Sequence, residues 1–177
     1  MVNMKQKFIF LALFITLFVS QTFAQSSWDL YQPRTLKEII TTIAAKSLKN
    51  PDVHIRDEKK DISIILSYNS FQSRVKATYT GSSRKVSDKR KEFISIWLKT
   101  LDKPKEYLDL FENEYLFIED KVEYWLPVQK QVASFFSEEL KKGDTVTLFV
   151  VWLGARKDKN SIDYIFLMNE FEAEENS

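Results

Sequence analysis

The chain has 177 residues, of which 26 are basic and 25 acidic, and it contains no cysteine. The near-neutral charge gives no global indication of binding to nucleic acid or to an anionic membrane. The lack of cysteine excludes disulfides, thiolate zinc sites, iron–sulfur clusters and cysteine nucleophiles, so an apolar core must supply the stability.

The first 24 residues have the pattern of a secretory signal peptide. Lys5 and Lys7 precede an apolar run over residues 8–19, which is shorter than the roughly 20 residues that a membrane-spanning helix needs. Thr22 and Ala24 place small residues at positions −3 and −1 of a cleavage site. We therefore expect export to the periplasm or the medium. The alternative is an uncleaved N-terminal anchor.

The rest of the chain has the length of one domain. We expect a signal peptide over 1–24, a polar lead-in over 25–34, a single globular domain over 35–172 and an acidic tail over 173–177.

The first half of this domain reads as a helix followed by strands. A helix is predicted over residues 35–49, because Thr35 and Glu38 fit a capping box and apolar residues repeat at helical spacing. Residues 52–61 are expected to form a charged loop, and residues 62–80 a β-hairpin. Gly81, Ser82 and Ser83 are expected to form a turn.

The second half alternates helices and strands. A helix over residues 88–101, capped by Ser87 or Asp88, precedes strands over 115–118 and 122–126. A third helix is predicted over 127–142, because proline is tolerated in a first helical turn and Gly143 can end the helix. Two largely apolar strands over 145–155 and 162–171 complete the domain.

If the helix over 88–101 is set aside as an insertion, this order resembles that of an OB-fold, in which one helix separates the third and fourth strands. We therefore expect an α+β fold: a small OB-like antiparallel barrel with an N-terminal helix and an inserted helix. The N-terminal helix would cover the outer face of the last hairpin, where Val151 and Leu167 lie. The alternative is an open antiparallel sheet with helices on one face.

Charge is segregated along the chain. Between Arg74 and Lys105 there are ten basic and three acidic residues, and residues 106–123 contain seven acids and one lysine. A basic run before a helix start favours an anion-binding surface, although such clusters are commonly solvated or compensated within a fold. The candidate binding residues are basic, hydroxyl or aromatic: Arg74, Lys76, Ser82, Ser83, Arg84, Lys85, Arg90, Tyr124 and Trp125.

No residue pattern predicts catalysis, a metal site or a cofactor. His54 is the only histidine, and the three glycines form no phosphate-binding loop. The carboxylates within residues 112–123 are candidates for a glycosidase pair, although nearly any acidic stretch provides such candidates.

We therefore expect an exported, non-catalytic binding or structural protein of the bacterial envelope, with a basic surface around residues 74–91. Its partner would be an envelope protein or an anionic ligand. The expected export argues against nucleic acid as the partner. The alternative is a cell-envelope glycan hydrolase that uses the carboxylates within 112–123.

Signal cleavage is directly testable. When the full chain is produced in a bacterial host, we expect the exported protein to begin at Gln25, because Ala24 offers the small residue that the cleavage site needs. N-terminal sequencing of the purified protein measures this. A mature protein that still begins at residue 1 would instead identify the segment as an anchor.

Overall fold

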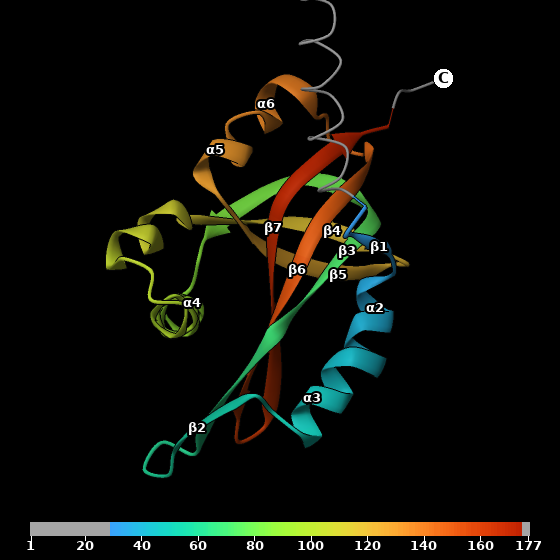
Figure 1. Ribbon diagram of the computed structural model, residues 1–177. Helices are drawn as coiled ribbons and strands as arrows, with labels where there is room; N and C mark the ends of the chain where they lie inside the picture. Colours follow the sequence, from blue (N-terminus) through green and yellow to red (C-terminus); the bar gives the residue numbers. More distant parts are fainter. Residues whose placement is uncertain (1–28, 175–177) are drawn as a thin grey trace, which may run out of the picture.

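The computed structural model describes residues 29–174 (Figure 1). The predicted signal peptide, the lead-in up to Trp28 and the tail from residue 175 lie outside this range. Between residues 29 and 174 no helix is long and apolar enough to cross a membrane.

Five strands form a closed barrel in the order β3–β4–β5–β7–β6, and β6 pairs back onto β3. Pairing of β3 with β6 from Phe71–Trp152 to Thr78–Thr145 closes the barrel, so the open-sheet alternative is wrong. The strands are β3 (Ile62–Lys85), β4 (Asn113–Glu119), β5 (Val122–Val128), β6 (Thr145–Asp158) and β7 (Ser161–Ala173).

The barrel is mixed rather than purely antiparallel, which corrects the prediction. β5 and β7 run parallel where Val128 pairs with Met168, and the other barrel pairs are antiparallel. The α+β class, the N-terminal helix and the inserted helix are confirmed.

β3 is one strand of 24 residues. The predicted hairpin over 62–80 and the turn at 81–83 are therefore wrong. The register with β4 shifts between Tyr79 and Ser83, and Gly81 adopts a φ of 76°. Glycine tolerates this conformation, so the irregularity interrupts the pairing without ending the strand.

The predicted loop over 52–61 contains a further strand, β2 (Val53–Asp57), which pairs antiparallel with the start of β3. Its turn is held by Asp57, whose Oδ1 accepts hydrogen bonds from the backbone N–H groups of Lys59 and Lys60. β2 has only five residues, and its apolar alternation is limited to Val53 and Ile55, which is too short a pattern to identify a strand within a charged segment.

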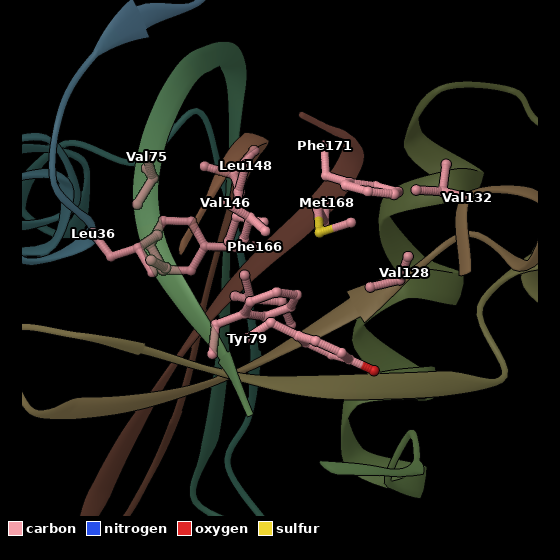
Figure 2. Close-up of a cluster of buried hydrophobic side chains, with 14 of the residues drawn as sticks. Leu36, Val75, Tyr79, Val128, Val132, Val146, Leu148, Phe166, Met168 and Phe171 are labelled. Carbon is pink, nitrogen blue, oxygen red and sulfur yellow. The ribbon is translucent and has the colours of Figure 1, made fainter. Parts of the chain in front are cut away.

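The barrel interior holds the larger apolar core. Figure 2 shows side chains from β3, β6 and β7 directed toward a common centre, with Leu36 on one side and Val132 on the other. The strand residues labelled there include Val75, Tyr79, Val146, Leu148, Phe166, Met168 and Phe171.

Two short helices, α5 (Lys130–Ala133) and α6 (Phe136–Glu139), cover one end of the barrel (Figure 1). The ring of Phe136 packs edge-on against the rings of Tyr115 and Phe171, with 4.6 Å and 5.1 Å between the ring centres. The predicted continuous helix over 127–142 is wrong, because Pro127 still pairs with Glu114 within β5. Proline is tolerated where a strand position needs no N–H donor.

The N-terminal helical segment consists of α2 (Leu36–Glu38), a π-helical stretch (Ile39–Ala44) and α3 (Ala45–Lys49). The predicted cap is confirmed, since Thr35 Oγ1 accepts a hydrogen bond from Glu38 N at 2.9 Å. Buried Glu119 of β4 accepts two more, from Leu36 N at 2.9 Å and Lys37 N at 3.2 Å. A two-residue strand, β1 (Gln32–Pro33), precedes this segment and pairs with β3.

The inserted helix α4 (Asp88–Thr100) covers the outer face of the last hairpin, so the assignment of this role to the N-terminal helix is wrong. A second apolar cluster joins Phe93 and Leu98 of α4 to Val151 and Leu167 of the hairpin. Of the two predicted caps, Ser87 caps α4 and Asp88 is its first residue, and a 3-10 helix (Lys105–Leu110) follows α4.

The cap supplied by Glu119 leads to a stability prediction. Glu119→Ala leaves the N–H groups of Leu36 and Lys37 without their buried acceptor, and we expect it to lower the free energy of unfolding by about 2–3 kcal/mol. Urea unfolding followed by circular dichroism measures the loss. The control Glu123→Ala removes an exposed carboxylate nearby and should change it by less than about 0.5 kcal/mol. Equal effects in the two variants would contradict the capping role.

Candidate functional site

Arg84 and Arg90, two of the predicted residues, meet at Glu114. Arg84 lies opposite Glu114 across β3 and β4, and its Nε is 2.5 Å from Glu114 Oε1. Arg90 comes from the first turns of α4, and its Nη1 is 2.5 Å from Glu114 Oε2. Glu114 is completely buried, so its charge depends on these partners.

Arg90 extends the network to β5 and β7. It donates to the backbone carbonyl of Trp125 at 2.6 Å and makes two hydrogen bonds to Asp163, at 2.7 and 2.9 Å. Burial alone would lower the pKa of Arg90, but its hydrogen bonds to Asp163 and the charges of Asp163 and Glu114 outweigh burial and raise the pKa. Arg90 therefore joins α4 to three strands as a permanent cation.

Trp125 is the third predicted residue at this place. The guanidinium carbon of Arg84 lies 4.0 Å from the centre of the Trp125 ring, which is within cation–π range. The Arg84 side chain is 51% exposed, whereas that of Arg90 is 14% exposed. Arg84 is thus the arginine of this network that a partner can reach.

A second charged network, which sequence reasoning missed, involves Lys89 and Glu92, the residues of α4 on either side of Arg90. Buried Arg156 of β6 pairs with Glu92 at 2.7 Å and with Asp158 at 3.2 Å, and Lys89 pairs with Asp158 at 2.7 Å. The hydrogen bond from Lys89, followed by the charge of Arg156, lowers the pKa of Asp158. Asp158 of the β6–β7 hairpin therefore compensates Lys89 of the predicted basic surface.

Other predicted residues on β3 lie near this site. Lys85 is 3.5 Å from Glu112, which also pairs with Lys130 at 2.5 Å, and the hydrogen bond from Lys130 is the main cause of the lowered Glu112 pKa. Ser82 and Ser83 are exposed on the strand rather than in the predicted turn before α4.

The remaining predicted residues lie elsewhere. Arg74 and Lys76 pair in register with Phe149 and Thr147 of β6, and Lys76 forms an ion pair with Glu174 near the C-terminal end. The half-buried side chain of Tyr124 packs against the barrel core, where burial raises its pKa. The predicted binding residues therefore do not form one continuous surface. The structure brings together four of them, Arg84, Lys85, Arg90 and Trp125.

The carboxylates proposed for glycan hydrolysis have other partners. Glu114 forms ion pairs with two arginines, and Glu112 forms ion pairs with two lysines. Glu119 accepts a backbone hydrogen bond at the start of α2. Glu114 and Glu119 lie five positions apart on β4, so their side chains point to opposite faces of the strand. Within residues 29–174 no group of three or more histidines, cysteines or carboxylates could hold a metal ion.

Comparison with protein-family models, with curated proteins and with solved structures finds no match for this chain.

The two arginines at Glu114 should differ in their effect on stability. Arg90→Ala leaves buried Glu114 with one half-exposed partner, and we expect a loss of about 3–5 kcal/mol in the free energy of unfolding. Arg84→Ala leaves the Arg90 pair intact, and the loss should stay below about 2 kcal/mol. Urea unfolding of both variants measures the difference, and an equal or reversed order would contradict the described network.

Proposed function

We propose that this protein is an exported, non-catalytic binding module of the bacterial envelope, and that it contacts an acidic partner protein around Arg84, Lys85 and Trp125. The observation that carries the proposal is the state of Arg84. Its guanidinium is half exposed, stacks on Trp125 and is anchored to buried Glu114. A side chain held in this way loses little conformational freedom when a partner binds.

Arg84 also keeps hydrogen-bonding capacity for a partner. Among the described residues, its side chain donates one hydrogen bond, from Nε to Glu114 Oε1. An arginine carries five N–H donors in a planar fork that matches a carboxylate. The two Nη groups therefore suit an aspartate or glutamate of an acidic partner.

We further propose that the barrel is OB-like. The strand order, the parallel pairing of β5 with β7 and the helices between β5 and β6 support this interpretation. In OB-folds the second and third barrel strands form the face that binds ligands. Those strands correspond here to β4 and β5, which carry Glu114 and Trp125.

A non-catalytic role fits the carboxylates better than hydrolysis does. A glycosidase needs two carboxyl groups facing each other across a cleft, one of them free to give up a proton. Glu114 is held by two arginines, and Glu119 accepts two backbone hydrogen bonds on the opposite face of β4.

A pull-down with matched variants tests the proposed surface. The exported protein, produced from the full chain, is used to capture partners from crosslinked envelope extract beside an Arg84→Ser, Lys85→Ser variant. Arg90 is left intact because it joins α4 to the barrel. The control is Lys99→Ser, Lys103→Ser, which removes two exposed cations elsewhere.

We expect a specific acidic partner whose recovery falls at least about tenfold in the Arg84/Lys85 variant, a factor that corresponds to about 1.4 kcal/mol, and is unchanged in the control. Equal recovery with all three proteins would contradict this surface. Recovery of no partner would contradict the binding role.

A further inference from the structure

The long strands β3, β6 and β7 continue beyond the barrel as an extension of the same sheet. β2, the start of β3 and the β6–β7 hairpin form a four-stranded antiparallel extension, seen at the lower end of Figure 1. One face of this extension carries Ile64 and Ile165, which belong to the apolar cluster under α4. The opposite face forms a groove.

This groove has a volume of about 470 Å³ and is lined by residues from all four strands, with Leu48 of α3 at its side. The size falls within the range of roughly 300–1,000 Å³ that is typical of small-molecule sites. Ile65 and Ile162 add apolar surface, and the polar lining includes His54, Arg56, Ser63, Lys157 and Lys159.

Strand register brings the side chains of Arg56, Ser63 and Lys157 into one row across three strands. Arg56 pairs with Ser63 across β2 and β3, and Ser63 pairs with Lys157 across β3 and β6. Residues directly opposite each other on adjacent strands point to the same face. Adjacent strands lie about 4.8 Å apart, so Arg56 and Lys157 are separated by roughly 10 Å with the Ser63 hydroxyl between them. Their long side chains can therefore reach one anion above Ser63.

The basic side chains that line the groove remain available to a ligand within the described part of the chain. No ion pair between described residues involves Arg56, Lys157 or Lys159, and the side chains of all three residues lie on exposed positions. Two acids also line the groove, Asp61 and Asp158, and the latter is already bound by Lys89 and Arg156. The groove therefore keeps an excess of available positive charge.

We propose that this groove binds a phosphate monoester with a sugar-sized body. Arg56, Lys157 and the Ser63 hydroxyl supply charge-assisted and neutral donors that suit a tetrahedral dianion. Leu48 and Ile162 line the space for the rest of the ligand. The site is distinct from the surface around Arg84 and does not depend on the function proposed for that surface.

Titration by nuclear magnetic resonance tests the groove. Glucose 1-phosphate is added at low salt to the ¹⁵N-labelled exported protein, and amide shifts are recorded beside titrations with glucose and with inorganic phosphate. We expect saturable shifts centred on Ser63 and Lys157 for the sugar phosphate, weaker binding of inorganic phosphate and none of glucose.

Two double variants separate the groove from general surface charge. Arg56→Gln, Lys157→Gln should weaken glucose 1-phosphate binding at least about tenfold, because it removes both cations of the row. Lys99→Gln, Lys103→Gln removes two exposed cations outside the groove and should change affinity by less than about twofold.

The proposal would be overturned by equal weakening of glucose 1-phosphate binding in both variants, or by shifts located outside the groove. It would also be overturned if no saturable shift appeared up to about 10 mM glucose 1-phosphate, a concentration that would reveal even a millimolar dissociation constant. If inorganic phosphate bound as tightly as glucose 1-phosphate, the claim that the groove also contacts a sugar-sized body would be wrong.

Discussion

The antiparallel pairing of β3 with β6 is the constraint on which both parts of the fold depend. It closes the barrel around the apolar core, and the same two strands continue into the extension that carries the groove. At Gly154 the two strands approach so closely that a Cβ atom would lie 2.0 Å from the carbonyl oxygen of Ile65. Gly154 also adopts a φ of 148°, which L side chains rarely do. A side chain at this position would separate the two strands where the barrel becomes the extension.

The segregated charges of the sequence compensate one another in the folded chain. Arg90 of α4 bonds to Glu114 of β4 and Asp163 of β7, while Arg156 of β6 bonds to Glu92 of α4. Buried pairs of this kind contribute little net stability, because desolvation opposes their attraction. They do penalise any placement of α4 that leaves Glu114 charged and unpaired. The apolar stripe of α4 thus supplies the driving force for docking, and the ion pairs select its orientation.

Strong local patterns predicted the helix over 88–101 with a cap at Ser87 or Asp88, the cap Thr35 and the final hairpin, and the structure has these elements. The continuity of β3 could not be predicted in this way, because Gly81 is as typical of a turn as of an irregular strand. Of the site, the sequence indicated Arg84, Arg90 and Trp125 but not the acids that hold them. Asp163 is distant from Arg90 along the chain and meets it only through tertiary packing. The row in the groove depends in the same way on strand register.

The position of the closing hairpin at the C-terminal end has a consequence for how the chain is made. β2, β3 and β4 precede residues 145–173 in the chain, and the barrel cannot close until these later residues are available to pair. Pairing over such sequence distances is slow, since a long loop must be ordered before its contacts form. A chain led by a signal peptide is threaded across a membrane before it has its native structure. In the proposed export, late closure of the barrel would keep the polypeptide unfolded during translocation. Folding would then be completed after the chain has crossed the membrane.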